Sequence, residues 1–445
     1  MIIKMFYAKK VHGYLDFAIH FNEDMSFLTG GNGSGKTTAL KLISALLTPN
    51  FQELLFIPFE EASIQVVHKQ EIIHIHAETF DNKVRLQISN CSEDLVLPRF
   101  SEDEEEFYTN KPGGKEEAIT EISRKFADHP VIVNISQIPS PIFLGLERKR
   151  EDPPKESGNY YYERERVHRA NAARIRARRL IRGSLGISLM ETELLVQDAY
   201  RRMRRAEESY STRLRDSILL SAFQYTEFDY EYPDIVKNAW LQKGSVLKRK
   251  QEIKEALSKI GITDSRLSSE VDTFFNRLTL LFERIQSQGD HFSIELLTNK
   301  AQIERIAKVV EVIDDHKSKI DRVFRPINEF LSTINSFFKD SNKKLTVDTV
   351  GQLVVDRPNG KGCTVEGLSS GERQILVIFA HAFFNRHSEH SNVFIIDEPE
   401  LSLHLRWQEQ FAKTILEISP QTQFIMATHS PEIVGENKHK AVKCR

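Results

Sequence analysis

The chain has 445 residues, of which 40% are hydrophobic and 28% charged, and its 61 lysines and arginines nearly balance its 63 aspartates and glutamates. This composition is typical of a globular protein of one to three domains, and the net charge of -2 gives no reason by itself to expect a polyanionic partner. No apolar run approaches the ~20 residues that span a bilayer, and the first ten residues lack the apolar core of a signal peptide. Three cysteines cannot by themselves form a disulfide framework or a zinc cage. We therefore expect a soluble, cytoplasmic protein that does not bind a membrane.

Residues 1–140 have the pattern of a β-rich half domain. Residues 19–30 predict a strand, a turn and a second strand that leads into a glycine-rich loop, and residues 36–47 have helical spacing. The apolar run PVIVNIS at 130–136 predicts a buried strand. Three further segments alternate apolar and polar residues and predict a small antiparallel sheet: 63–68, 71–78 and 83–88.

Residues 141–340 consist of long, charged segments with helical spacing. They predict an inserted all-α domain that is partly coiled coil. Apolar residues between Ile303 and Phe338 recur at steps of three and four. This predicts a helix over 301–338, roughly 55 Å long, with Pro326 as the place for a kink. Such stripes pack helix against helix, and we expect a short antiparallel hairpin rather than a long arm.

Strand patterns return in residues 341–445. Apolar strands are predicted at 344–348, 352–356, 393–397 and 424–428, and helices near 371–385 and 402–417. The chain is therefore predicted to be an α/β protein in which the two halves, 1–140 and 341–445, flank the helical insertion 141–340.

The glycine-rich segment GGNGSGKT fits the phosphate-binding loop pattern G-x-x-x-x-G-K-[ST]. Its glycines let successive backbone N–H groups turn towards phosphates, and the helix that begins near Lys36 directs its positive end at them. Lys36 can reach the β- and γ-phosphates, and the hydroxyl of Thr37 can bind Mg²⁺. The residues expected to bind ATP here are Gly30, Asn32, Gly33, Ser34, Gly35, Lys36, Thr37 and Thr38.

The segment VFIIDEPE at 393–400 is an apolar strand that ends in adjacent carboxylates. Asp397, at the strand tip, is suited to hold Mg²⁺ directly or through water. Glu398 is suited to polarise the water that attacks the γ-phosphate. An acidic pair at a strand end is common, but its presence in a chain that also has a phosphate-binding loop predicts an ATP-hydrolysing site.

Two more motifs follow in a fixed order. Leu368-Ser369-Ser370-Gly371-Glu372 begins a predicted helix 28 residues before Asp397, and His429 follows a strand 32 residues after Asp397. With the phosphate loop and the acidic pair, this order resembles the ABC ATPase superfamily, in which LSGGQ is the signature and a histidine acts as a switch. The LSSGE form is similar to that of SMC-like and RecF-like proteins. The resemblance covers roughly 1–140 and 341–445 and implies an ABC-type P-loop NTPase head, with a mixed sheet, flanking helices and an antiparallel β subdomain.

In such heads the signature of one subunit completes the nucleotide site of another. The resemblance therefore implies that Ser369, Gly371 and Glu372 of one copy face Lys36, Thr37, Asp397 and Glu398 of a second copy across the ATP. It makes Lys36, Glu398 and His429 the catalytic residues. A head-to-tail dimer with two composite sites, or a larger assembly of such dimers, is the implied oligomer.

The family also places a glutamine, which senses Mg²⁺, after the strand that precedes the helical region. Gln137 is the residue that fits this position, with Gln52 and Gln65 as alternatives. His404 stands where transport ATPases have an aspartate in the loop after the acidic pair, a form that resembles OLD-like and RecF-like proteins and leaves the contribution of this loop open.

The spacing of the motifs selects a branch. Ser369 lies 333 positions after Lys36, which leaves room for a helical insertion but not for an SMC-length arm, and only some fifteen residues follow His429, where an OLD nuclease carries its TOPRIM domain. The chain therefore resembles the ATPase subunit of antiphage systems such as PARIS or Septu, the retron-associated ATPases included. That resemblance implies a sensor or scaffold that controls a separate nuclease effector. The alternatives are a RecF-like ATPase in DNA repair or recombination, and a scaffold that needs ATP only for assembly.

An arginine-rich segment bears on partners. From Arg164 to Arg205 there are 12 arginines against 4 acidic residues, and three tyrosines precede them at 160–162. Arginines bind phosphates and tyrosines stack on bases, so the segment could bind DNA or a DNA-mimicking or otherwise acidic protein. A solvated helix face or an intersubunit ion-pair surface explains the same composition.

Overall fold

The computed structural model describes residues 1–48, 51–99, 114–144, 189–222, 249–259, 265–288, 294–358, 360, 362–384 and 392–444. The chain divides into two compact units, which are described separately. The α/β unit consists of residues 1–197 and 330–445, and the helical unit of residues 198–329. The helical unit therefore lies within the range predicted for the insertion.

The first layer of the α/β unit is an antiparallel sheet with the strand order β2-β1-β4-β5-β6-β7. Apolar and polar residues alternate along these strands, so one face is buried, as the burial of every second residue of β4 shows. Three of the strands confirm the segments predicted at 63–68, 71–78 and 83–88. The strands are β1 (Ile2–Val11), β2 (Leu15–His20), β4 (Glu61–His68), β5 (Glu71–Phe80), β6 (Lys83–Ile88) and β7 (Leu95–Pro98).

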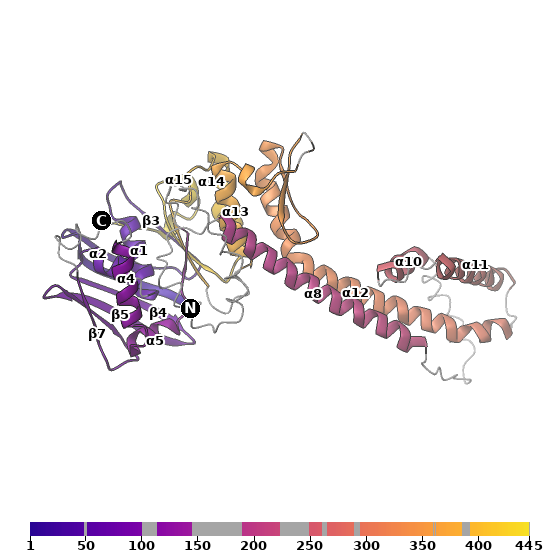
Figure 1. Ribbon diagram of the computed structural model, residues 1–445. Coiled ribbons are helices and arrows are strands. Elements are labelled where there is room, and N and C mark those ends of the chain that lie inside the picture. The colour runs from indigo at the N-terminus through magenta and orange to yellow at the C-terminus, as the bar shows by residue number, and fades with distance from the viewer. Residues whose placement is uncertain are drawn as a thin grey trace. The chain divides into compact units, whose positions relative to one another are not determined.

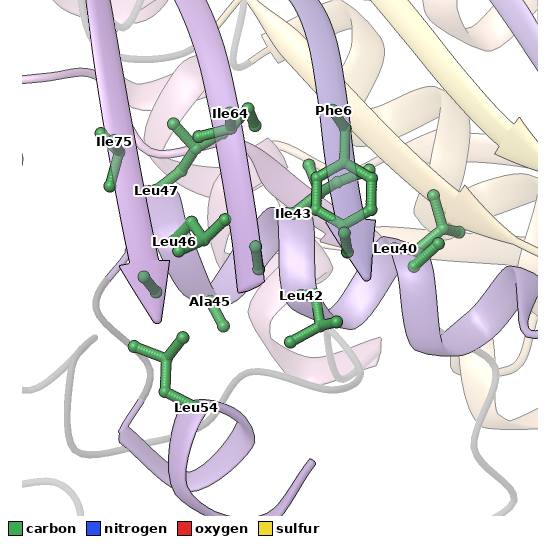
Figure 2. Close-up of a cluster of buried hydrophobic side chains, with 14 of the residues drawn as sticks. Phe6, Leu40, Leu42, Ile43, Ala45, Leu46, Leu47, Leu54, Ile64 and Ile75 are labelled. Atoms are coloured by element: carbon green, nitrogen blue, oxygen red, sulfur yellow. The ribbon is translucent and has the colours of Figure 1, made fainter. Parts of the chain in front are cut away.

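Helix α1 (Lys36–Leu47) packs against the buried face of this sheet. Ile43, Leu46 and Leu47 of this helix lie near Phe6 of β1, Ile64 of β4 and Ile75 of β5, and all of these side chains are almost fully buried (Figure 2). Leu54 of α2 (Phe51–Phe56) joins the same core. Burial of this apolar stripe holds the helix in place, because a 12-residue helix alone is marginal in water.

The second layer is a parallel sheet with the strand order β13-β3-β12-β11-β8. Its central strands β11 and β12 are buried along their length, as in parallel sheets covered on both faces. The sheet combines strands from both sequence halves, and their carboxyl ends meet at one edge. The strands are β3 (Met25–Thr29), β8 (Ile142–Leu144), β11 (Val393–Asp397), β12 (Gln423–Ala427) and β13 (Ala441–Lys443).

The prediction of a strand at 130–136 is wrong, because this segment is helix α5 (Pro130–Ser136). Pro130 occupies the first helical position, where its missing N–H costs nothing, and the side chain of His129 caps the helix by accepting from the backbone N–H of Val131. The strand that pairs with β11 is β8, which begins after α5 and after Gln137.

The C-terminal half of the α/β unit adds a hairpin and helices at the predicted places. The hairpin pairs β9 (Lys344–Val347) with β10 (Leu353–Asp356). Helix α13 (Ser370–Phe384) packs against α14 (Leu405–Ile418), which in turn packs against α15 (Pro431–Val434). A short helix, α4 (Gly114–Lys125), lies in the N-terminal half.

The helical unit is built on the larger parts of two long antiparallel helices, α8 (Leu189–Ala222) and α12 (Ile294–Phe338), whose residues 189–197 and 330–338 belong to the α/β unit. They run side by side in Figure 1, and Tyr200 stacks edge-on against Phe324 while Leu214 packs near Val310. The antiparallel pairing was predicted, but α12 has 45 residues, about 67 Å at 1.5 Å per residue, and it continues through Pro326. The expectation of a short hairpin is therefore wrong.

Helices α10 (Lys250–Lys259) and α11 (Ser265–Gln288) complete this unit and share its small apolar core. Of the arginine-rich segment, residues 164–188 and Tyr160–Tyr162 lie outside the described residues. Arg201, Arg202, Arg204 and Arg205 are exposed on α8. Among the described residues, no helix combines the length and the apolar run that a bilayer crossing requires.

Candidate functional site

The phosphate loop joins β3 to α1 at the edge where the parallel strands end. Gly33 and Gly35 have φ angles of 79° and 81°, a region that favours glycine. A side chain at Gly35 would also lie 2.7 Å from Leu15 and Phe17 of β2. Asn32 and Gly33 are exposed at the tip of the loop, and Thr38 is half-buried in the first turn of α1. The loop therefore presents backbone N–H groups and the positive end of α1 to a phosphate.

The side chain of Lys36 is buried and joins the phosphate loop to the end of β12. Its ammonium donates to the carbonyl oxygens of Gly30 (3.1 Å) and Gly31 (3.2 Å) and lies 2.7 Å from Nε2 of His429. An ammonium has no acceptor, so Nε2 is the acceptor in this pair. The contact brings together two predicted site residues that are 393 positions apart.

Asp397 ends β11 beside the first turn of α1. Burial raises the pKa of its carboxyl group, while a hydrogen bond with Thr37 opposes this shift. Its Oδ1 atom is buried and has no hydrogen-bond partner among the described residues. The hydroxyl of Ser34 in the loop is also buried and has no partner among them. A buried, unsatisfied carboxylate oxygen next to a threonine hydroxyl is a donor set that fits a hard cation such as Mg²⁺.

Glu398 follows in a strained conformation, with φ of 48° in a residue that is not glycine. Its backbone N–H donates to the carbonyl oxygen of Ala427 (2.8 Å), so this conformation is fixed by the end of the neighbouring strand β12. The turn places its half-buried carboxylate just beyond Asp397, at the same edge of the sheet.

Glu400 links this turn to His429. Its Oε1 atom accepts from the backbone N–H of His429 (2.6 Å), and its Oε2 atom accepts from the hydroxyl of Thr428 (2.8 Å). No sequence motif marks Glu400, because its position depends on contacts with residues 28 and 29 positions away. Only the carboxyl side chain itself, close behind the acidic pair, could have indicated it.

The signature residues form a second cluster at the start of α13. The backbone N–H of Ser369 donates to Oε2 of Glu372 (2.7 Å), and the N–H of Glu372 points back to the hydroxyl of Ser369 (3.4 Å). This is a capping box, which satisfies free donors at a helix start. A side chain on Gly371 would lie 2.3 Å from the carbonyl oxygen of Ser402, so the signature helix packs directly on the loop after the acidic pair.

The metal role predicted for Gln137 loses its basis. Gln137 is exposed at the end of α5 and precedes β8, whereas the family pattern needs a glutamine after that strand. The alternatives fare no better, since Gln52 lies in α2 and Gln65 within β4. His404 caps the start of α14 by accepting from the backbone N–H of Arg406 (3.4 Å).

The comparisons with known proteins agree with this geometry. A family model described as AAA ATPase domain matches residues 1–164 and 189–434. The chain belongs to this ATPase family. The match covers both sequence halves and most of the helical region between them, so the resemblance to ABC-type and SMC-type ATPases inferred from the motifs is confirmed.

Three curated relatives share part of this AAA ATPase. The chromosome partition protein Smc of Halothermothrix orenii is 28% identical over 194 residues, 42% of this chain and 15% of Smc. The Retron Vc95 probable ATPase of Vibrio cholerae is 23% identical over 186 residues, 39% of this chain and 36% of the relative. The Retron Ec83 probable ATPase of Escherichia coli is 27% identical over 144 residues, 28% of this chain and 26% of the relative. The chain thus spans well under half of the length of each.

SMC heads also occur among similar solved structures. The SMC head domain from Thermotoga maritima is 12% identical with a TM-score of 0.37. The matched part covers 98% of this chain and 91% of the SMC chain. The Smc head of Pyrococcus furiosus bound to the C-terminal domain of ScpA is 14% identical with a TM-score of 0.39, and covers 97% of this chain and 91% of its own.

Proposed function

We propose that the protein binds ATP with Mg²⁺ and hydrolyses it in pockets shared between two copies arranged head to tail. One observation carries this proposal. Lys36, Asp397 and His429 lie at one edge of the parallel sheet, whereas Ser369 belongs to a separate cluster on α13. A pocket with phosphate-binding and metal-binding groups is completed when the signature of a second copy closes over it.

Each residue has a role that follows from its position. Lys36 and the backbone N–H groups of the loop neutralise the triphosphate, and His429, held beside Lys36, contacts the terminal phosphate. Thr37 and Asp397 would hold Mg²⁺, which would screen the charge that develops on the phosphates. Glu398 orients the attacking water and accepts its proton.

The same proposal assigns ATP turnover to a switch in bacterial antiphage defence, in which this ATPase controls a separate nuclease. The similarity to the Vc95 and Ec83 retron ATPases supports this role. So does the long antiparallel pair of α8 and α12, which offers a surface outside the α/β unit for a partner protein.

The test combines biochemistry with a phage challenge. Lys36→Ala should abolish ATP binding, and Glu398→Gln should retain binding, slow hydrolysis at least about 100-fold and accumulate ATP-bound dimers. Both variants should lose protection against phage in cells, while Lys83→Ala, an exposed lysine on β6, should keep it. Full protection by folded Lys36→Ala and Glu398→Gln variants would refute the proposed role.

A second candidate is a DNA-binding ATPase in repair or recombination. It is favoured by the similarity to Smc and by the four exposed arginines of α8, at 201, 202, 204 and 205. This candidate predicts ATP-dependent DNA binding whose affinity falls steeply with salt. Replacement of the four arginines by glutamine should then remove both the DNA binding and its salt dependence, and cells without the protein should show repair defects without a phage phenotype.

A further inference from the structure

Glu372 is a charged residue in a place where water cannot reach it. Its side chain is 3% exposed, yet it carries a carboxylate at the start of α13. The Oε2 atom of this carboxylate accepts two hydrogen bonds, each of 2.7 Å, from the backbone N–H of Ser369 and from the ammonium of Lys343. Lys343 is itself mostly buried, with 20% of its side chain exposed.

Hydrogen bonds keep Glu372 ionised. Burial by itself would raise the pKa of this carboxyl group, but hydrogen bonds from Lys343, from the backbone of Ser369 and from the hydroxyls of Ser341 and Ser369 hold the pKa below its usual value. A buried carboxylate of this kind depends on its cation, because removal of one partner leaves an uncompensated charge in a dry environment.

The pair also fixes the signature serine. Oε2 of Glu372 accepts from the N–H of Ser369, and the hydroxyl oxygen of Ser369 accepts from the N–H of Glu372. The hydroxyl of Ser369 also hydrogen-bonds the carboxylate of Glu372. The backbone and the side chain of Ser369 are therefore both held by Glu372 at the start of α13.

Lys343 is held in place by the end of α12. The side-chain amide of Asn335, on the last turns of α12, donates to the carbonyl oxygen of Leu345 (3.0 Å) and accepts from its N–H (2.7 Å). Phe337, two residues later, stacks against Phe379 of the signature helix α13. The end of α12 thus fixes the backbone two residues after Lys343 and packs against the helix that carries Glu372.

We propose that Lys343 is a positioning residue for the signature: its ammonium holds the carboxylate of Glu372, which holds Ser369 in the geometry that closes over the ATP of a second copy. This inference rests on the proposed function, since it assumes pockets shared between two copies. It adds that the end of α12 controls how well the signature closes over the ATP of the second copy.

The experiment measures nucleotide binding and ATP-dependent dimerisation separately. In the slow Glu398→Gln background, Lys343→Met should leave the affinity for a fluorescent ATP analogue within about twofold, because the phosphate loop is untouched. It should weaken ATP-dependent dimerisation, measured by analytical ultracentrifugation, by about tenfold or more, the scale of one lost bond to a charged group. Hydrogen exchange at the Ser369 amide should accelerate without nucleotide, and Lys343→Arg should restore both readouts.

A charge-matched double variant is the main control. Glu372→Gln keeps an oxygen for the Ser369 N–H but carries no charge, so the Lys343→Met, Glu372→Gln double variant should dimerise better than Lys343→Met alone. Because it has no unpaired buried charge, this double variant should fold even if the single variant does not. If the double variant dimerises no better than Lys343→Met alone, Lys343 does not act through the charge of Glu372, and the inference is overturned. The same holds if Lys343→Met misfolds and the second substitution does not restore folding.

Two other outcomes are distinct. If Lys343→Met dimerises with ATP as well as its Glu398→Gln parent does, the inference is wrong while the proposed function stands. If the Glu398→Gln parent itself binds ATP but forms no dimer, the shared pocket is wrong, and the inference falls with it.

Discussion

Gly371 has no room for a side chain. A Cβ atom there would lie 2.3 Å from the carbonyl oxygen of Ser402, and a backbone atom cannot yield as a flexible side chain can. We expect Gly371→Ala to lower the free energy of unfolding by about 1–3 kcal/mol, the usual cost of overpacking, and to displace the signature. Urea unfolding measures the first effect. Gly31→Ala is the matched control, because a Cβ at Gly31 meets nothing within 4 Å, and its stability should stay near wild type.

Under the proposed function, we expect Glu400 to act on catalysis through His429. Glu400→Gln leaves one oxygen where two are used, so either the His429 N–H or the Thr428 hydroxyl loses its carboxylate partner. We expect kcat for ATP hydrolysis to fall by about tenfold, equivalent to ~1.4 kcal/mol, with KM for ATP nearly unchanged. Steady-state kinetics would separate these terms. A change in KM alone would mean that Glu400 serves nucleotide binding and not the position of His429.

At the scale of single residues, the residues predicted from the sequence are those that belong to a local motif. Lys36, Thr37 and Asp397 are recognisable because a phosphate loop and an acidic strand end have fixed neighbours. Lys343 and Glu400 were not predicted, since each acts through a partner 28 or 29 positions away along the chain. No local pattern distinguishes them from ordinary surface charges.

At the scale of elements, the two errors have different causes. A seven-residue apolar run such as PVIVNIS fits a buried strand or a buried helix turn equally well. Pro130 at the first helical position and the capping side chain of His129 favour the helix. The strand of this region, β8, has three residues and is too short for any periodicity to show. Helix α12 begins at Ile294, seven residues before the predicted start, in a segment that contains no glycine or proline to end it.

Gln423 connects elements that are far apart in the sequence. Its buried amide accepts from the backbone N–H of Ile3 (2.8 Å) and donates to the carbonyl oxygens of Ile3 (2.8 Å) and Asn22 (2.8 Å). Gln423→Leu has a similar volume but leaves these backbone groups unsatisfied. We expect a loss of about 2–4 kcal/mol in unfolding free energy. Gln87→Leu, which removes only an exposed hydrogen bond to Asp94, should stay within ~0.5 kcal/mol.

The start of α13 should also respond to pH. The pKa of Glu372 is lowered in the folded protein, so the unfolded chain binds its proton first as pH falls. The stabilisation by this carboxylate is complete above the unfolded value of about 4.3 and is lost as pH falls through the lower folded value. The difference in urea stability between wild type and Glu372→Gln should shrink over this range. Parallel pH profiles for the two proteins would contradict the buried ion pair.

At the scale of the whole molecule, the two sequence halves are interleaved within one sheet. Strand β3, which leads into the phosphate loop, lies between β12 and β13, and β11 lies between β12 and β8. Two segments separated by more than 200 residues thus build the edge of the sheet at which the phosphate loop and Asp397 lie. The helical unit is inserted between them in the chain, so the α/β unit needs both halves for its parallel sheet.

Because each pocket is expected to take its phosphate loop from one copy and its signature from another, two inactive variants should complement each other. Lys36→Ala inactivates the phosphate loop, and Ser369→Arg blocks the signature. A mixed dimer then holds one pocket with both defects and one with neither. An equimolar mixture should form mixed dimers as half of the total and recover about a quarter of the wild-type ATPase rate per chain, a statistical expectation for closed two-fold pairs. A mixture as inactive as its components would show that each chain completes its own pocket.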